Sequence, residues 1–514
     1  NLRLGVNAGN SIASGGNNNV VLGDEAGTAL TTGTRNVAVG FEALKTEDGH
    51  GRNVAIGYHA LEDLNAGANA YNIGIGYNGG ANLTTGVQNV IIGGQAGVDL
   101  SDADGNIALG YQALKVDTLG SKSVAIGSSS LHAQNFTTAT DSFNTAVGYE
   151  AGGAVTTGVN NTLIGGASGD ALTEGAQNVA LGVAALTSDT LGSKSVAIGN
   201  FALEVQNFTT ATDAFNVAVG HQAGDSVTTG VQNVLIGSQS GDALTDADFN
   251  VAIGHVSLST DTLGSRSTAV GYGALNAQNF TTATQTYNTA VGAEAGAAVT
   301  TGTSNTFIGA LSGDAVTVGY NNAALGMHSL GSDTTGRGST AVGVSALQSQ
   351  NFTGNETSNN TAVGFQAGLN VTTGTFNCLF GSNAGDAMTT ALGNVAIGTN
   401  SQGVNTASDK NVSLGNNTLA TLNHTDGTDA YNVAVGHQTG LQMTTGSINV
   451  LIGGLAGDAL TVGNSNVVVG TSALTTDTKG DQSVAIGNNA LSLQNFTTST
   501  DAHNVAVGAE AGND

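Results

Sequence analysis

Acidic side chains recur at fixed intervals along the chain and come nearest, in type and spacing, to a metal site. Two columns of aspartates recur in steps of 72 along the numbering, the second with one position skipped: Asp170, Asp242, Asp314, Asp386 and Asp458, and Asp117, Asp189, Asp261, Asp333 and Asp477. Carboxylates stacked in this way are candidates for holding Ca²⁺ if main-chain carbonyls converge on them. The sequence has no EF-hand or Gly-Gly-x-Gly-x-Asp motif, which favours the alternative that they are solvated turn acids.

Other residue types give weaker signals for chemistry. The nine histidines lie scattered, without an i, i+4 pair or cysteine partners, so we expect no zinc site. The single cysteine, Cys378, stands where other repeats have Val or Thr, which indicates a small core residue rather than a functional thiol. No carboxylate pair or nucleophile–base pair stands out, so the sequence predicts no enzyme, no catalytic residue and no cofactor.

A segment that recurs at the same interval carries an aromatic side chain and reads Gln-Asn-Phe-Thr-Thr-Ala-Thr at 134–140. Its phenylalanines are Phe136, Phe208, Phe280, Phe352 and Phe496. A second aromatic column follows at Tyr71, Phe143, Phe215, Tyr287 and Tyr431. The phenylalanine loops are candidates for surface contacts with a partner, as a row of protruding apolar groups. The alternative is that each loop folds back and buries its own phenylalanine.

The composition excludes several classes of partner. Acidic residues number 37 against 11 basic ones, a formal net charge of −26, so no basic surface is expected for nucleic acid or anionic lipid. No apolar run approaches the roughly 18 residues of a membrane span, so no membrane insertion is expected from this segment. Gly accounts for 78 of 514 residues, yet 39% are hydrophobic. The chain can therefore bury a core, although a thin one.

The dominant pattern is a repeat, Asn-Val-Ala-Val/Ile-Gly, which occurs 29 times. From Gly76 onward the steps from one of its glycines to the next are 17, 17, 17 and 21, so a 72-residue super-repeat of four units occurs six times over residues 77–508. Residues 1–76 are a slightly irregular start. No linker interrupts the pattern, and residues 1–514 are expected to form a single continuous shaft.

A period of 17 is too short for two helices and their turns, but it fits two short strands and two turns. We therefore predict an all-β fold, a parallel β-solenoid (β-roll) with one coil per repeat, of length 17 or 21. The invariant glycine marks the end of a strand, with a positive φ or a close backbone approach. The absence of Pro agrees with this prediction, because a continuous ladder needs almost every backbone N–H.

Four residues before each of these glycines the chain has Asn in 24 repeats and Ser in five. If coils stack in register, these amides lie one above another and hydrogen-bond along the stack. The next residue is β-branched in 26 repeats and the residue before the glycine is always apolar, so these two share one face of the strand. Neighbouring coils are therefore expected to stabilise each other.

The residue between these two apolar positions is mostly Ala, but a large residue replaces it once per super-repeat. These large residues are Ile91, Leu163, Leu235, Phe307, Leu379 and Leu451. A strand that is apolar on both faces is normally buried on both. We expect this column to face the symmetry axis of an oligomer, with the large residues filling its centre. The alternative is a coil interior of two layers that accepts both faces.

The motifs resemble repeats of two kinds of fibrous protein. Ser-Val-Ala-Ile-Gly at 123–127, 195–199 and 483–487 is similar to the head repeat of trimeric autotransporter adhesins of the YadA type. Asn-Thr-Ala-Val-Gly at 144–148, 288–292 and 360–364 is similar to repeats in phage tail-fibre shafts. The first resemblance implies a left-handed parallel β-roll, a homotrimeric rod and binding to a surface or matrix. Coils of length 17 and 21 are longer than that family's usual repeat, which leaves phage fibre and bacterial adhesin both open.

These patterns predict a structural fibre shaft or adhesin outside the cell, on a virion or a cell surface. Its partners would be its own copies, as a homotrimer, and a cell-surface glycan or other receptor. Two alternatives stay open, an ice-binding solenoid and the monomer unit of an extracellular filament. The first rests on Thr-Thr-Gly at 84–86, 156–158, 228–230, 300–302, 372–374 and 444–446, once in four coils, whereas a flat ice-binding lattice needs Thr on every coil.

Overall fold

The fold is an all-β parallel solenoid in a computed structural model that describes residues 1–354 and 356–513. These residues form strands and turns, and among them no helix is long and apolar enough to cross a bilayer. The chain divides into two compact units, Asn1–His255 and Val256–Asp514.

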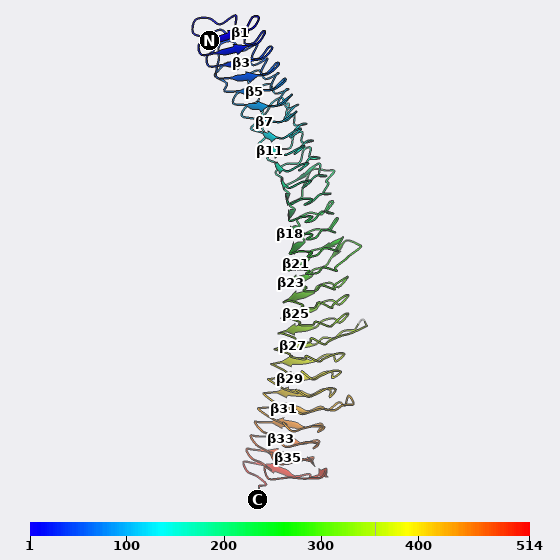
Figure 1. Cartoon of the computed structure of the whole chain (residues 1–514). Helices are drawn as coiled ribbons and strands as arrows, with labels where there is room; N and C mark the ends of the chain where they lie inside the picture. Colours follow the sequence, from blue (N-terminus) through cyan, green and yellow to red (C-terminus); the bar gives the residue numbers. More distant parts are fainter. Residues whose placement is uncertain (355, 514) are drawn as a thin grey trace. The chain divides into compact units, whose positions relative to one another are not determined.

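In the first unit each coil contributes one three-residue strand to a parallel sheet, and neighbouring coils pair in chain order (Figure 1). These strands are β1 (Leu2–Leu4), β2 (Val20–Leu22), β3 (Val37–Val39), β4 (Val54–Ile56), β5 (Ile73–Ile75), β6 (Val90–Ile92), β7 (Ile107–Leu109), β9 (Val124–Ile126), β11 (Thr145–Val147), β12 (Thr162–Ile164), β13 (Val179–Leu181), β15 (Val196–Ile198), β17 (Val217–Val219), β18 (Val234–Ile236) and β19 (Val251–Ile253). The long coils add short parallel pairs, β8 (Gly120–Ser121) with β10 (Thr140–Asp141), and β14 (Gly192–Ser193) with β16 (Thr212–Asp213).

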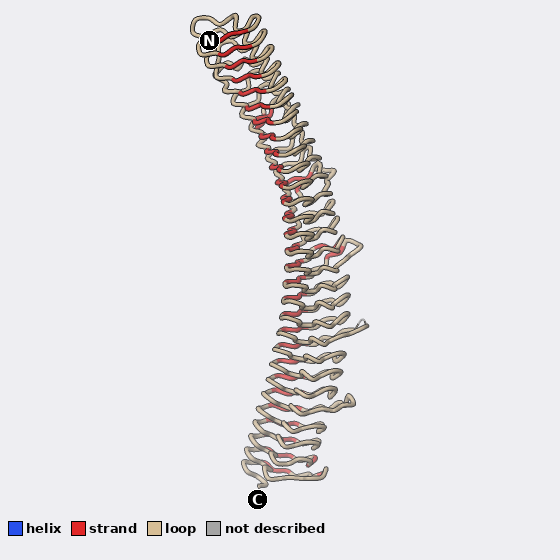
Figure 2. The backbone as a smooth tube through the Cα atoms, in the orientation of Figure 1, coloured by secondary structure: helices blue, strands red, loops and turns tan. Residues whose placement is uncertain are grey.

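The second unit has the same architecture. Its three-residue strands are β21 (Thr268–Val270), β23 (Thr289–Val291), β24 (Thr306–Ile308), β25 (Ala323–Leu325), β26 (Thr340–Val342), β27 (Thr361–Val363), β28 (Cys378–Phe380), β29 (Val395–Ile397), β30 (Val412–Leu414), β31 (Val433–Val435), β32 (Val450–Ile452), β33 (Val467–Val469), β35 (Val484–Ile486) and β37 (Val505–Val507). The short pairs are β20 (Gly264–Ser265) with β22 (Thr284–Gln285), and β34 (Gly480–Asp481) with β36 (Thr500–Asp501). Figure 2 shows the strands of this unit along one side of its coils.

Like residues lie on like residues, as the repeat predicts. Val124 of β9 pairs with Thr145 of β11, and Ala125 pairs with Ala146. The glycine after each strand is required for both reasons that the sequence suggested, a positive φ and a close approach of another backbone. Gly165 has a φ of +138°, and a Cβ added to it would lie 2.2 Å from the carbonyl oxygen of Gly182 in the next coil. Only a residue without a side chain allows that approach.

The predicted amide ladder is present, and it joins side chains to main chain. The backbone N–H of Asn161 donates to Oδ1 of Asn144 at 2.9 Å. Asn161 Nδ2 donates to the carbonyl of Gly175 in the next coil at 2.9 Å, and Asn161 Oδ1 accepts the N–H of Asn178 at 2.9 Å. Asn suits this column because one short side chain supplies both an acceptor and a donor.

The prediction that the central column of each strand faces an oligomer axis is wrong. Its large residues are fully buried within the single chain: Ile91, Leu163, Leu235, Phe307, Leu379 and Leu451. They fill the interior of the coil where glycines leave room. A Cβ at Gly152 would lie 2.7 Å from Leu163 Cδ1, and one at Gly169 would lie 2.8 Å from Leu163 Cδ2. The next two coils, with Ala180 and Ala197 at the centre of their strands, carry Leu186 and Leu203 in place of these glycines, so the volume of the interior stays filled.

Candidate functional site

A buried carboxylate holds the long coil in five of the six super-repeats. Asp117 is fully buried, and its Oδ1 accepts the backbone N–H groups of Gly120 and Phe136, each at 3.1 Å. Its Oδ2 accepts Nε2 of Gln134 at 2.5 Å, and the same Nε2 donates to Ser123 Oγ at 2.8 Å. The arrangement recurs at Asp189, Asp261, Asp333 and Asp477.

The expectation that this column consists of solvated turn acids is therefore wrong. Its members are interior residues, because three donors replace the water around each carboxylate. Burial raises the pKa of Asp189 and Asp333, and the hydrogen bonds from Gln206 and Gln350 oppose that shift. The surroundings also do not fit Ca²⁺, which needs oxygen ligands rather than N–H donors.

The long coils bury their phenylalanines, as the alternative interpretation held. The side chains of Phe136, Phe208 and Phe280 are 5%, 5% and 6% exposed, Phe352 is 1% exposed, and Phe496 is half-buried. The expectation of protruding phenylalanines is therefore wrong for the first four. The backbone N–H bond to the buried aspartate pulls each of these residues inward.

The second aromatic column supplies the exposed rings instead. Phe143 is 53% exposed, and Lys122 Nζ lies 5.2 Å from the centre of its ring. Lys122 also pairs with Asp141 at 2.5 Å. Equivalent cation–ring pairs are Arg52 with Tyr71, Lys194 with Phe215, Arg266 with Tyr287, and Lys410 with Tyr431. We call the four at residues 122–143, 194–215, 266–287 and 410–431 the ring stations.

The fifth super-repeat departs from the others in several linked positions. Asn405 replaces the buried aspartate, Leu422 replaces the glutamine, and His424 replaces the phenylalanine. This super-repeat also keeps Asn411 in the ladder column, where the others have Ser before a long coil. Asn411 Oδ1 accepts the N–H of Asn432 at 3.1 Å, so the ladder continues through this long coil. The Ser and the Asp–Gln pair thus occur together because Ser Oγ bonds to the Gln.

The outward face of each sheet is apolar. In most strands the central residue is buried and the two flanking residues are half-buried or exposed. Leu181 is 43% exposed, Leu325 47% and Phe380 52%. Cys378 is half-buried on this face, which corrects its assignment to the core. The outward face is therefore a row of Val, Thr, Ile and Leu side chains along each unit.

The other acidic column lines the surface. Asp170, Asp242, Asp314, Asp386 and Asp458 are all half-buried. Asp170, Glu150 and His132 line an open cavity of about 520 Å³. Burial raises the pKa of Asp242 to about 6, with a smaller contribution from the charge of Asp225. Calcium at this column stays a prediction.

A second polar column was missed because Thr-Thr-Gly draws attention to only one coil in four. The eighth residue after the motif glycine is Thr in three coils of most super-repeats, for example Thr156, Thr173 and Thr190. Thr156 Oγ1 donates to the carbonyl of Thr173 at 3.2 Å, and Thr173 Oγ1 donates to that of Thr190 at 3.0 Å. These hydroxyls therefore link neighbouring coils.

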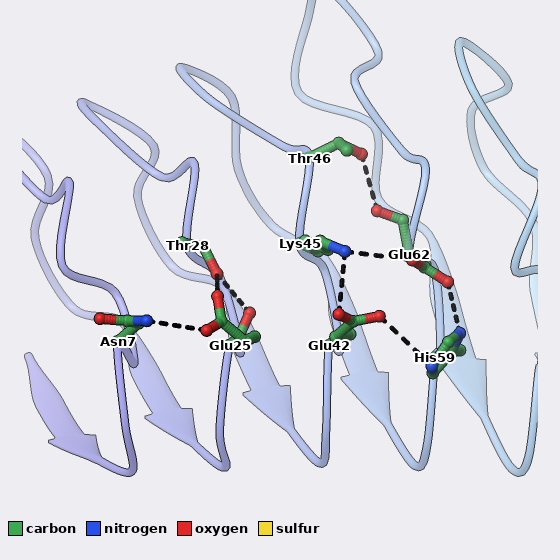
Figure 3. A network of polar contacts seen from close by, with 8 residues as sticks. All are labelled: Asn7, Glu25, Thr28, Glu42, Lys45, Thr46, His59 and Glu62. Carbon is green, nitrogen blue, oxygen red and sulfur yellow. Dashed lines mark hydrogen bonds and ion pairs between the residues drawn. The ribbon is translucent and has the colours of Figure 1, made fainter.

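The first unit also contains a cluster of charged groups near its start (Figure 3). Lys45 Nζ lies 2.9 Å from Glu42 and 3.6 Å from Glu62, and His59 contacts both carboxylates at 3.3 Å and 2.5 Å. The hydrogen bond from Lys45 lowers the pKa of Glu42. In the described part of the chain, two groups bring three possible metal ligands together: Glu42, His59 and Glu62, and Glu47, Asp48 and His50.

The geometry therefore comprises stacked coils, an outward apolar face, the ring stations and two clusters of charged side chains. Each is set by the column that a residue occupies in the repeat. Comparison with known proteins finds no family model that matches the chain and no curated protein that matches it.

Proposed function

We propose that the chain is the shaft of an extracellular fibre, a phage tail fibre or a bacterial surface adhesin, that attaches to a cell or surface and catalyses no reaction. The observation that carries this proposal is the registration of coils within each unit. Every coil presents the same columns of side chains to its surroundings, so the surface is periodic. Such a surface suits repeated weak contacts with a partner that is itself repetitive.

The shaft assembles as a homotrimer through its outward sheet faces. Support comes from exposed side chains such as Leu181 in the first unit and Leu325 and Phe380 in the second, which belong to an apolar row along each unit of a kind that soluble monomers seldom carry. The resemblance to trimeric adhesin repeats points to three copies. The faces that meet differ from the sequence expectation, because the central column is already buried within one chain.

The ring stations are the receptor contacts of this shaft. Each offers an exposed aromatic ring with a cation at its face, as Lys122 does at Phe143. Aromatic rings stack on the flat apolar faces of sugars while the charged group stays solvated. The proposed partner is therefore a repetitive cell-surface glycan.

Sedimentation velocity tests the assembly. The variant Leu181→Lys, Ile236→Lys, Leu325→Lys, Leu414→Lys adds four charges to the outward face, and we expect monomers where the parent protein is a trimer. The matched control is Val205→Lys, Val318→Lys, Leu392→Lys, Leu493→Lys, which adds the same charge at exposed apolar residues outside the strands. A monomeric parent at micromolar concentration would contradict the trimer.

Glycan-array binding tests the receptor contacts. Replacement of Phe143, Phe215, Tyr287 and Tyr431 by Ala should abolish binding while the oligomer persists, and the four-lysine control variant should bind as the parent does. Retained binding would assign the contact elsewhere on the shaft.

An ice-binding solenoid is a second candidate function. The Thr column supports it more strongly than the Thr-Thr-Gly motif does. Thr side chains line three coils in four rather than one in four. Their hydroxyls, however, donate to main-chain carbonyls of the next coil, as at Thr156 and Thr173. Thermal hysteresis of the purified chain would support this function, and none is expected.

A further inference from the structure

One coil near the start of the chain departs from three columns of the repeat at once. The preceding coil reads Leu-Thr-Thr-Gly at 30–33 and the following coil reads Leu-Asn-Ala-Gly at 64–67, whereas this coil reads Glu-Asp-Gly-His at 47–50. Compared with the preceding coil, Leu30 is replaced by Glu47, Thr31 by Asp48 and Gly33 by His50, and the first of these positions lies in the column that also holds the buried Asp117. Glu, Asp and His can all act as metal ligands. Neutral substitution of surface residues would not also change a buried position such as that of Glu47.

Glu47 is fully buried and incompletely satisfied. Its Oε1 accepts the backbone N–H of His50 at 3.0 Å, whereas its Oε2 is buried and has no hydrogen-bond partner among the described residues. Asp117 occupies the same column and has partners for both oxygens, because Gln134 follows it in the next coil. The coil after Glu47 supplies Leu64 at that place, whose side chain has no donor, although the backbone of Ala66 in that coil does interact with the Glu47 carboxylate.

His50 brings a free ring nitrogen to the same point. Its Nδ1 lies 3.4 Å from Glu47 Oε1 and 3.9 Å from Asp48 Oδ1, and it has no hydrogen-bond partner in the described chain. One ligand atom from each of the three residues lies within 4.8 Å of the others. Asn36 Nδ2 donates to the carbonyl of His50 at 3.0 Å, so the amide ladder fixes the backbone of this loop.

We propose that Glu47, Asp48 and His50 bind a divalent transition-metal cation of the Zn²⁺ type. Ligands at the bond lengths of a tetrahedral Zn²⁺ site lie about 3.3 Å apart, close to the separation of Glu47 Oε1 and His50 Nδ1. The mixed nitrogen and oxygen set suits Zn²⁺ and not Ca²⁺ or Mg²⁺, which take oxygen ligands.

The cluster of Glu42, His59 and Glu62 is a built-in comparison. It offers the same residue types, but Lys45 Nζ already lies 2.9 Å from Glu42 and 3.6 Å from Glu62. A lysine ammonium supplies the positive charge there, and a metal ion would have to displace it. We therefore place the metal at Glu47, Asp48 and His50.

Isothermal titration of the full chain with Zn²⁺, after chelator treatment and removal of any histidine tag, tests this site. We expect one Zn²⁺ per chain at micromolar or tighter affinity, and at least tenfold weaker binding of Ca²⁺ and Mg²⁺. The variant Glu47→Leu, Asp48→Thr, His50→Gly, called here the restored-repeat variant, gives this coil the residues that the preceding coil has at the same three positions, so it should fold, and it should lose the Zn²⁺ site. The control variant His59→Ala, Glu62→Gln should keep it.

Thermal unfolding gives an independent readout. Zn²⁺ should raise the Tm of the parent and of the control variant, and leave that of the restored-repeat variant unchanged. Equal Zn²⁺ affinity in the restored-repeat variant, loss of binding in the control, or no binding by the parent would each overturn the proposal. In the last case Glu47 and His50 form an ion pair only.

Discussion

At the scale of the residue, Asn and Gly determine how one coil lies on the next. The Asn side chain is short enough to stay inside the coil and still reach two main-chain groups of its neighbour, as Asn161 does. Ser in this column does not make the same hydrogen bonds to the main chain of the next coil. The hydroxyl of Ser123 bonds instead to Gln134 and Ser142, and Nδ2 of the next Asn, Asn144, donates to Gln134 Oε1.

Replacing one ladder residue tests its contribution. Asn161→Ala leaves the N–H of Asn178 and the carbonyl of Gly175 buried without partners, which should cost about 2–5 kcal/mol of the free energy of unfolding. Urea denaturation measures it. Thr157→Ala, an exposed change in the same coil, should cost under about 0.5 kcal/mol. Equal effects of the two changes would contradict the role of the ladder.

Sequence reasoning predicts these residues well because their columns are almost invariant. It fails for Asp117, because an aspartate in a turn is normally solvated and its main partner, Gln134, lies in the next coil rather than nearby in the sequence. The signal was nevertheless present. In every super-repeat with the buried aspartate, the same position of the next coil is Gln and the ladder residue between them is Ser, and all three change together in the fifth super-repeat.

At the scale of the element, each strand ends where two backbones nearly touch. Gly165→Ala would place a methyl group 2.2 Å from the Gly182 carbonyl oxygen at a φ of +138°. We therefore expect the free energy of unfolding to fall by about 3–5 kcal/mol, as for a substitution that opens a large cavity in a core. Gly166→Ala is the control, because nothing lies within 4 Å of its added Cβ. It should be neutral or slightly stabilising by urea denaturation. A tolerated Gly165→Ala would show that the coils can separate there at little cost.

The long coil is held by its aspartate. Asp189→Ala removes the acceptor for Gln206 Nε2 and for the N–H groups of Gly192 and Phe208, and each stranded donor should cost about 1–3 kcal/mol. We expect residues 206–214 to become sensitive to limited proteolysis while the neighbouring coils stay resistant. Asp213→Ala, which removes only the exposed pair with Lys194, should leave the cleavage pattern unchanged.

At the scale of the molecule, the buried acids of a chain with a net charge of −26 make the free energy of unfolding depend on pH. Burial raises the pKa of Asp189, Asp225, Asp242, Asp314 and Asp333. A raised pKa means that the folded state binds the proton more tightly than the unfolded state. The stability that these protonated aspartates contribute is therefore fully present below the pKa of Asp in the unfolded chain, about 4, and is lost as the pH rises through the pKa of the folded state.

Asp242 gives the sharpest test of this linkage, since its pKa is raised to about 6. The free energy of unfolding of the first unit should fall between pH 4 and pH 6.5, and Asp242→Asn should flatten that slope. Asp246→Asn removes the same charge from an exposed site in the same coil and should leave the slope unchanged. Urea denaturation across this pH range measures all three, and an identical slope in Asp242→Asn would refute the assignment.

The period of the chain predicted the solenoid, the length of its coils and their registration. It did not predict which apolar face is internal, because Ala and Val are both apolar and the pattern alone does not show which of the two columns fits the volume of the interior. Leu163 lies inside because Gly152 and Gly169 leave a space that it fills. The pairing of large central residues with glycines was visible in the sequence as a complementary pattern, but only a packed interior explains it.

This exchange of volume between coils has an evolutionary consequence. The two ends of a block of four coils present equivalent packing surfaces. An in-frame duplication of the DNA that encodes such a block therefore adds four coils whose junctions pack like the existing ones. Unequal recombination among such copies changes the number of coils while every inherited contact is preserved. Length is thereby free to vary under selection, whereas a lone point mutation inside a coil meets resistance from both neighbours.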